Sequence, residues 1–262
     1  MLKKRWKELL LTAVILPCLI QPASAHVVWF DYQNGEYDIL FGHPEDGPEP
    51  YAPSKFKEAT VYDASRQTIP FTINQKEDGL SLTPNSQPSA ITGFFDNGFF
   101  ARTDTGSKQI AESEVKDYGN VGHYLKYTKA FYDWSDTLAK PYNQPLEIIP
   151  LENPLDVKPG DSLQVKVLYQ GNQISDAVVE HLGKSFPVDN NGIFSVPIGI
   201  EGLQQLEAGY SLPAIGNLRT SYEASLTAQR ISVPEPSALL GLVAFGTLLG
   251  VYNKKKQLPS NN

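Results

Sequence analysis

The stretch PGDSLQVKVLYQGN, residues 159–172, decides the fold class. Apolar and polar side chains alternate between Leu163 and Leu168, which is the period of a strand with one buried face. Pro159-Gly160-Asp161 is expected to form a turn before this segment, and Tyr169-Gln-Gly-Asn172 another after it. A short strand closed at both ends by turns is typical of an antiparallel β protein.

The same pattern continues in both directions along the chain. Apolar segments such as TVYDA (60–64) and GIFSVPI (192–198) are separated by many of the 20 Gly and 20 Pro residues. Asp189-Asn190-Asn191-Gly192 supplies residues that tolerate the left-handed conformation a hairpin needs. No long helical periodicity occurs between the two ends of the chain, and only a short helix is expected around 107–117. We therefore predict an all-β protein.

We predict two β-sandwich-like domains, divided at Lys140-Pro-Tyr-Asn-Gln-Pro145. The second, residues 145–231, holds six or seven short strands in about eighty-five residues, which suits a small Greek-key sandwich. The first, residues 26–144, is expected to be an N-terminal β domain. The prediction implies that residues 146–231 form a β-sandwich separable from the preceding domain, and that 140–145 is more sensitive to proteolysis than the strands around it.

Residues 1–25 have the organisation of a signal peptide, with an expected N-terminal signal helix. Basic residues between Lys3 and Lys7 precede an apolar stretch at 9–20 and the small-x-small run Ala23-Ser24-Ala25. Cleavage there makes His26 the first residue of the mature chain. The single cysteine, Cys18, is removed with the leader, which excludes disulfides, cysteine metal sites and cysteine nucleophiles.

The other end, residues 232–262, resembles the PEP-CTERM sorting signal of exopolysaccharide-producing bacteria, cyanobacteria among them. Val233-Pro-Glu-Pro-Ser237 precedes an apolar helix at 238–252 and then Lys254–Lys256. About fifteen apolar residues are short beside the roughly 20 that span a bilayer, and the lysines should stay cytoplasmic. The resemblance implies an exosortase-type protease and transient membrane contact; a permanent single-pass anchor is the alternative. The expected location is the periplasm, cell surface or extracellular matrix.

The net charge of the mature chain and the lack of common catalytic motifs exclude several classes of function. The chain has 22 Lys and Arg, of which four lie in the leader and three in the tail. It has 29 Asp and Glu, of which one lies in the leader and one in the tail. The mature body therefore has 15 basic and 27 acidic residues and a net charge near −12. This argues against nucleic acid and anionic lipid as partners and permits cations, although solubility explains it equally well. No P-loop, GxSxG or HExxH motif occurs, and we expect no enzyme.

A histidine at the mature N-terminus is a chelating residue. Its α-amine, with a reference pKa of about 7.7–8.0, and its imidazole Nδ1 can bind one metal ion. His43 or His123 is expected to add an imidazole and Asp31 a carboxylate, in a site suited to Ni, Co, Cu or Zn. Each histidine also has an ordinary interpretation. For His26 it is that a polar residue happens to follow a cleavage site; His43 is as readily a surface residue, and His123 and His181 suit structural roles better.

Several motifs together resemble the periplasmic accessory proteins of nickel and cobalt uptake (NikM-like), a family long catalogued as a domain of unknown function. They are HVVW (26–29), FGH (41–43), KYTKAFYDW (126–134), LEIIPLENP (146–154) and SYEASLT (221–227). The resemblance implies a transthyretin-like or carboxypeptidase-regulatory-like second domain and metal binding outside the cell. It implies nickel or cobalt as the metal and an energy-coupling-factor-type transporter as partner.

Two further functions stay open behind metal uptake. The sorting signal and predicted sandwiches also suit an exopolysaccharide-associated surface or adhesion protein, in which aromatic residues such as Phe94-Phe95 and Phe99-Phe100 stack on sugars instead of filling a core. A copper-dependent oxidase rests on His26 alone and ranks last. The carboxylates of the acidic loop 44–49 suggest a calcium site, but the loop lacks EF-hand spacing, so a solvated loop is the better interpretation.

Overall fold

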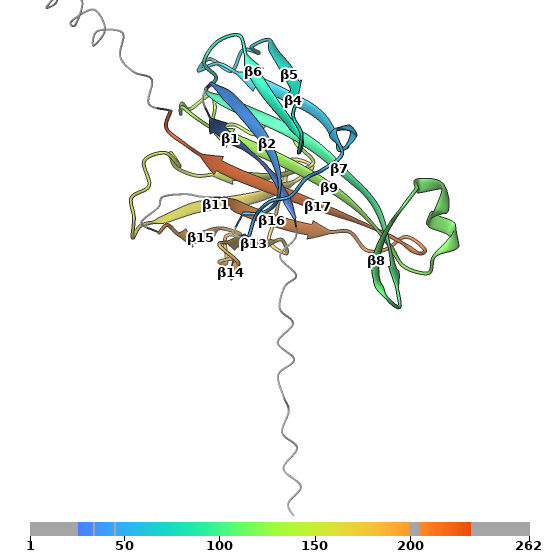
Figure 1. The fold of residues 1–262 in the computed structure, drawn as a ribbon. Coiled ribbons are helices and arrows are strands. Elements are labelled where there is room, and N and C mark those ends of the chain that lie inside the picture. Colours follow the sequence, from blue (N-terminus) through green and yellow to red (C-terminus); the bar gives the residue numbers. More distant parts are fainter. Residues whose placement is uncertain (1–25, 34, 45, 200–204, 232–262) are drawn as a thin grey trace, which may run out of the picture.

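The computed structural model describes residues 26–33, 35–44, 46–199 and 205–231, and these form three stacked β-sheets (Figure 1). The all-β prediction is confirmed. Helical structure within the described ranges is limited to two 3₁₀ turns, Pro53–Lys55 and Glu112–Asp117. None of these helices is long and apolar enough to cross a membrane. The predicted signal helix in 1–25 and hydrophobic helix at 238–252 lie outside the described residues.

The central sheet has eight strands and runs through the middle of the molecule. Its order is β14-β13-β16-β17-β9-β7-β4, with β8 paired to β7. The strands are β4 (Phe56–Tyr62), β7 (Ala90–Thr103), β8 (Gly106–Ile110), β9 (Val121–Phe131), β13 (Val178–His181), β14 (Lys184–Phe186), β16 (Leu206–Ser211) and β17 (Leu218–Ala228). β17 and β9 pair in parallel over eleven residue pairs, while the other pairings in this sheet are antiparallel.

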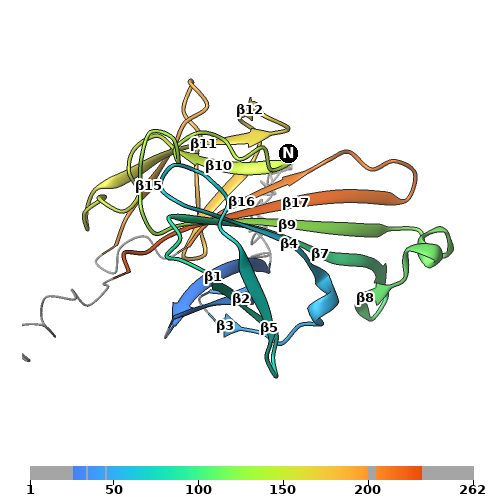
Figure 2. The same ribbon diagram turned by 90° about the horizontal axis from the view of Figure 1, so that it is seen from above.

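Two smaller sheets lie on opposite faces of the central sheet, as the view from above shows (Figure 2). The N-terminal sheet comprises β1 (Val27–Gln33), β2 (Glu36–His43), β3 (Gly47–Pro48), β5 (Phe71–Gln75) and β6 (Leu80–Pro84). The C-terminal sheet comprises β10 (Leu146–Pro150), β11 (Ser162–Tyr169), β12 (Asn172–Ile174) and β15 (Phe194–Pro197). The central sheet is therefore the shared layer of two sandwiches.

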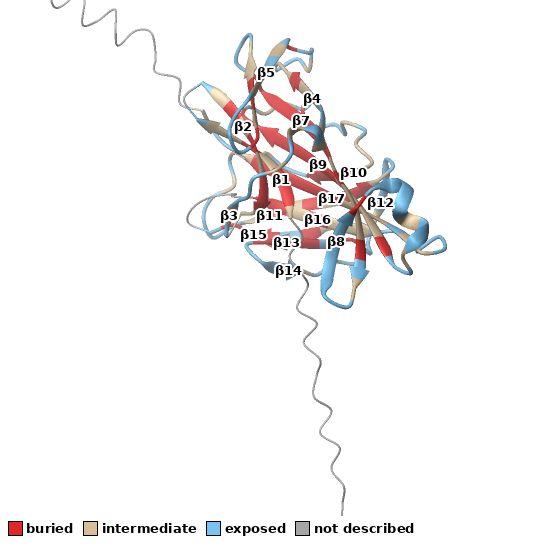
Figure 3. Cartoon of the chain, turned by 45° about the vertical axis from the view of Figure 1, so that its right-hand side comes forward, coloured by how far each residue is buried: buried red, intermediate tan, exposed pale blue. Residues whose placement is uncertain are grey.

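Each interface between sheets has its own hydrophobic core. Along β9, Tyr127 and Phe131 pack into the core beneath the C-terminal sheet, whereas Ala130 packs into the core beneath the N-terminal sheet. Because β9 is covered on both faces, every residue from 126 to 131 is buried, in place of the alternation of a one-sided strand (Figure 3). β9 is thus the structural centre of the molecule.

Of the local elements expected from the sequence, a strand and a turn are found and a helix is found only in part. The expected strand in 159–172 is β11, whose burial alternates from Ser162 to Val167. The expected hairpin turn at Asp189–Gly192 lies between β14 and β15, where the Asp189 carboxylate accepts the amide hydrogens of Asn191 and Ile193. The helix expected around 107–117 is wrong in its first half, because 106–110 pairs with β7 as β8 and only Glu112–Asp117 is helical.

The predicted division at 140–145 falls in a strand-free connection that ends where β10 begins. Strands from both sides of it share one sheet: β4, β7, β8 and β9 precede the connection, and β13, β14, β16 and β17 follow it. Whether 26–144 and 145–231 fold independently therefore stays a prediction, as does the Greek-key or transthyretin-like topology of the second part.

Candidate metal centre

The pairing of β1 with β2 brings the first predicted ligand beside the second. Val27 pairs with Gly42 in an antiparallel ladder, so the next positions outward, His26 and His43, lie at the same end of the hairpin. Val28 and Phe30 on β1 are buried in the core under the N-terminal sheet, which fixes the register of the ladder. The position of His26 next to His43 therefore follows from the hairpin itself.

A short return strand adds a carboxylate to the two imidazoles. β3 pairs back on β2, with His43 opposite Gly47 and Gly42 opposite Pro48, and the Glu49 amide donates to the Phe41 carbonyl at 2.7 Å. This return needs glycine at 42, where φ is +142° and a Cβ would lie 2.9 Å from the Gly47 carbonyl oxygen. The tight crossing places Glu49 against His26.

His26, His43 and Glu49 form the candidate metal centre. Their nearest ligand atoms all lie within 4.8 Å of one another. His26 Nε2 is 2.9 Å from Glu49 Oε1, and the two imidazole centroids are 4.2 Å apart with a 51° tilt. The His26 and Glu49 side chains are 40% and 50% exposed, so an ion can reach them from solvent. Two imidazoles and one carboxylate fit a divalent transition metal better than calcium, which requires more oxygen ligands.

Aromatic side chains support the centre from below. The Phe41 ring stacks on the His26 ring at 5.2 Å and 19°, and on the buried Phe95 ring at 4.9 Å and 13°. Tyr51 packs against both phenylalanines and donates its hydroxyl hydrogen to the Ile39 carbonyl at 2.8 Å. His26 therefore rests on a platform that is continuous with the core.

A buried ion pair holds the backbone of the same residue. The Lys126 ammonium on β9 donates to the His26 carbonyl oxygen and to the Glu223 carboxylate on β17. Both side chains are buried, and the Lys126 Nζ lies 5.9 Å from the centre of the Phe41 ring. Three sheet elements, β1, β9 and β17, thus meet at His26.

The other two predicted ligands lie elsewhere. Asp31 is opposite Asp38 on the β1–β2 ladder and accepts a hydrogen bond from Gln33 at 2.8 Å. His123 lies 2.9 Å from Asp96 and stacks on Phe99 at 4.1 Å. Neither belongs to the cluster of His26, His43 and Glu49.

His181, for which the sequence favoured a structural role, is buried in β13. Its exposed fraction is 3%, and its Nδ1 is 2.8 Å from the Gln205 carbonyl oxygen. This position is typical of a structural histidine, since the ring is enclosed and its contact is with backbone.

Sequence reasoning missed Glu49, because it treated the acidic loop 44–49 as a solvated loop. The run GHPEDGPEP is a signal for the loop, though not for Glu49 among its carboxylates, because Gly42 and Gly47 flank a reversal long enough to return the chain to His43. A hairpin that ends in histidine and folds back on itself brings its own acidic residues to that histidine.

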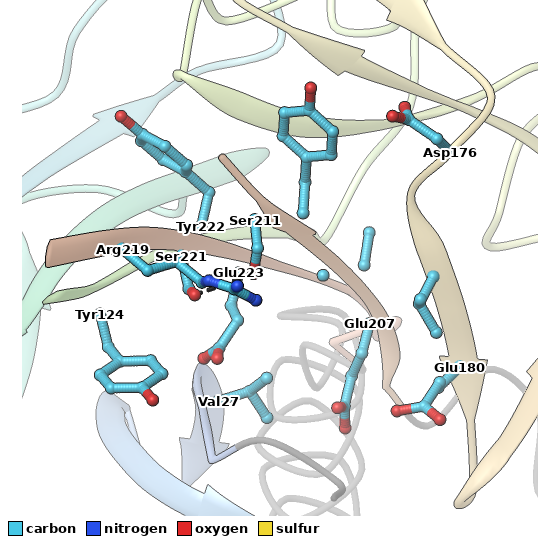
Figure 4. Close-up of a pocket in the computed structure, with 14 residues that line it drawn as sticks. Val27, Tyr124, Asp176, Glu180, Glu207, Ser211, Arg219, Ser221, Tyr222 and Glu223 are labelled. Carbon is cyan, nitrogen blue, oxygen red and sulfur yellow. Dashed lines mark hydrogen bonds between the residues drawn. The ribbon is translucent and has the colours of Figure 1, made fainter. Parts of the chain in front are cut away.

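A groove of about 550 Å³ with both apolar and charged lining residues lies beside the centre (Figure 4). Its lining includes Val27, which follows His26, and Glu223, the partner of Lys126. The carboxylates of Glu180, Glu207 and Glu223 project to the side of the strands where Val27 lies. Most of its lining residues belong to β13, β16 and β17 of the central sheet.

The fold and the centre define a class of protein: an all-β chain of three stacked sheets that gathers two imidazoles and a carboxylate at the outer end of its first hairpin. The chain belongs to the family described as a domain of unknown function, DUF4198, whose model matches residues 20–211. The matched range contains all three residues of the centre. No curated protein and no solved structure matches the chain.

Proposed function

We propose that this protein binds a divalent transition metal ion outside the cytoplasm, as an accessory protein for nickel or cobalt uptake. The observation that carries the proposal is the cluster of His26, His43 and Glu49, whose ligand atoms lie within 4.8 Å of one another on an accessible surface. The net charge of the mature body near −12 supports a cation as the ligand. The role is one of binding, without catalysis.

The contacts of His26 suit chelation by a mature N-terminus. If export processing exposes the His26 amine, this amine and Nδ1 bind one ion, and His43 supplies a second imidazole. Nε2 is then on the far side of the ring, where Glu49 Oε1 lies at 2.9 Å and accepts its hydrogen. Carboxylates commonly orient metal-bound histidines in this way and raise their basicity. In the alternative arrangement Nε2 and Glu49 both bind the ion directly.

The choice of metal rests on the motif resemblance and not on the ligand set. Imidazole and carboxylate ligands accept copper and zinc as well, and copper has the highest intrinsic affinity in the divalent series. Preference for nickel or cobalt must come from geometry or supply. An energy-coupling-factor-type transporter as partner, exosortase-type processing and transient C-terminal membrane anchoring belong to the same proposal.

Metal titration by calorimetry tests the function directly. The protein beginning at His26 should bind one nickel or cobalt ion. His43→Ala should weaken binding by at least about 10-fold, since even the partners of metal ligands typically contribute 10- to 100-fold. His123→Ala is the matched control and should bind as the wild type does. Equal affinity of the wild type and His43→Ala would contradict the site.

A form with one extra residue before His26 separates the two arrangements. The extra residue converts the amine to an amide but leaves the imidazole and the fold in place. Strong loss of affinity supports the amine chelate, whereas retained affinity together with a loss in Glu49→Gln supports direct binding through Nε2 and Glu49.

A second candidate, an exopolysaccharide-associated surface protein, is favoured by one observation. Five aromatic rings follow one another across four strands of the central sheet and β11: Phe94, Tyr127, Tyr222, Tyr169 and Tyr210, with successive centroids 4.9–6.5 Å apart. All except Tyr127 are partly exposed. Polysaccharide pull-down with Tyr210→Ala as the test variant distinguishes this role, because metal titration does not involve that residue.

A further inference from the structure

Two lysines on β9 are buried with carboxylate partners. Lys126 pairs with Glu223, and Lys129 pairs with Glu147 at 2.7 Å; both lysines are 2% exposed. Their spacing of three residues in a strand directs them to opposite faces of the central sheet. Each pair joins a strand before the 140–145 connection to a strand after it. The two pairs are therefore alike in chemistry, burial and connectivity.

They differ in one respect, which is contact with the candidate metal centre. Lys126 also donates to the His26 carbonyl oxygen and lies over Phe41, the ring on which the His26 imidazole stacks. The Glu147 carboxylate beside Lys129 instead accepts the Tyr142 amide hydrogen, in the connection between the two halves. Only one of the two pairs can influence His26.

His26 needs such an anchor because it precedes the first residue of β1. The β1–β2 ladder begins at Val27 and Gly42, so strand pairing does not fix the His26 backbone. Its side chain is half-exposed and meets His43, Glu49 and Phe41. A buried, immobile ammonium on the adjoining carbonyl restricts the rotation that would swing the residue into solvent.

We propose that Lys126, held by Glu223, is a positioning residue of the metal centre, fixing the His26 backbone so that its imidazole meets His43 and Glu49. The inference rests on the proposed metal-binding function. The Glu223 carboxylate neutralises the ammonium, so Lys126 can lie near a bound cation without adding net positive charge there. Buried ion pairs are often replaced by apolar groups with little loss of stability, so the contribution of this pair to binding can be measured separately from its contribution to folding.

The test compares two double variants. Lys126→Met/Glu223→Gln removes the charges of the first pair together, which avoids leaving one buried charge unpaired. Lys129→Met/Glu147→Gln makes the same change in the second pair and is the matched control. Nickel affinity should fall about 10- to 100-fold in the first variant, as for residues that orient a metal ligand, and should stay at the wild-type value in the control.

A measurement on the metal-free protein adds a second readout. Nuclear Overhauser contacts between the His26 and His43 rings should be present in the wild type and the control and absent in Lys126→Met/Glu223→Gln. Wild-type affinity and contacts in that variant would overturn the positioning role, as would equal losses in both double variants. A wild-type protein that binds no metal would instead defeat the proposed function, while the ring contacts would still decide whether Lys126 positions His26.

Discussion

At the scale of single residues, Glu49 sets how strongly the candidate metal centre binds a cation. Glu49→Gln keeps an oxygen acceptor of similar shape but removes the negative charge beside His26 Nε2, which is 2.9 Å away. We expect nickel affinity to fall about 10-fold, because the carboxylate either binds the ion or strengthens the imidazole that does. Isothermal titration of the two proteins gives the ratio.

The control for this change is Glu58→Gln, an exposed carboxylate on β4 outside the cluster. It alters the net charge by the same amount. If both substitutions weaken binding equally, long-range charge and not the Glu49 contact accounts for the effect.

The candidate site could be predicted in part from these residues. His26 was predictable because it follows a predicted signal-peptide cleavage site, and His43 because it lies in the FGH motif of the family resemblance. Glu49 could not be separated from its acidic neighbours, since its position depends on the pairing of β3 with β2. Asp31 lies five residues from His26 along an extended strand, roughly 16 Å away, and it is not part of the cluster.

At the scale of elements, the return of β3 depends on Gly42. Gly42→Ala should lower the free energy of unfolding by about 1–3 kcal/mol, because its φ of +142° is strained for alanine and the new Cβ would meet the Gly47 oxygen and Glu49 nitrogen at 2.9 and 3.1 Å. Metal affinity should fall as well, since relief of the clash moves Glu49. Urea denaturation and titration measure the two effects.

Gly119→Ala provides the comparison, because a Cβ at Gly119 meets no atom within 4 Å. We expect its stability to match the wild type within about 0.5 kcal/mol, as for other surface changes. A similar loss in both variants would mean that general glycine effects, and not the crossing at β3, are responsible.

Element types were predictable where local chemistry decides them. Alternation and turn residues predicted β11 and the hairpin turn at Asp189–Gly192. The parallel pairing of β17 with β9 joins residues about a hundred positions apart, and no local pattern encodes it. The short helix expected around 107–117 is confirmed only over Glu112–Asp117, since 106–110 pairs with β7 as the second strand of a local hairpin.

At the scale of the whole molecule, the shared central sheet should hold the two parts of the chain together after cleavage between them. Limited proteolysis within 140–145 tests the predicted division into 26–144 and 145–231. We expect the two parts to stay associated after cleavage, because β9 and β17 pair over eleven positions and two buried ion pairs cross between the parts. Size-exclusion chromatography of the nicked protein should give one peak, which separates only in denaturant. Two independent folded peaks would contradict this expectation.

The tyrosines make stability fall at alkaline pH. Burial raises the pKa of Tyr51 and Tyr169 to about 12 and raises those of Tyr37, Tyr127, Tyr132 and Tyr142 as well. Unfolded tyrosine titrates near 10, so the folded state holds these protons more tightly. Their contribution to stability is complete below about pH 10 and is lost as pH rises toward 12.

Lys129 acts in the opposite direction, because burial lowers its pKa and the folded state releases its proton first. Lys55, whose pKa burial also lowers, acts in the same way. Two lysines oppose six tyrosines, so the net slope of stability against pH above pH 10 should be downward. Denaturant unfolding followed at a series of pH values, with phenolate absorbance as a second signal, should show tyrosine ionisation accompanying unfolding. Full phenolate formation in a protein that is still folded would contradict the assignment.

The position of β17 near the end of the described chain also limits the order in which contacts can form as the polypeptide is made. Strand β9 emerges early, with Lys126 and Lys129 on its two faces, but Glu147 and Glu223 follow about twenty and about a hundred residues later. Until the last strand arrives, one ammonium has no carboxylate and β9 lacks a neighbour on one side. The anchor of His26, Lys126 held by Glu223, is therefore complete only after the last strand has docked.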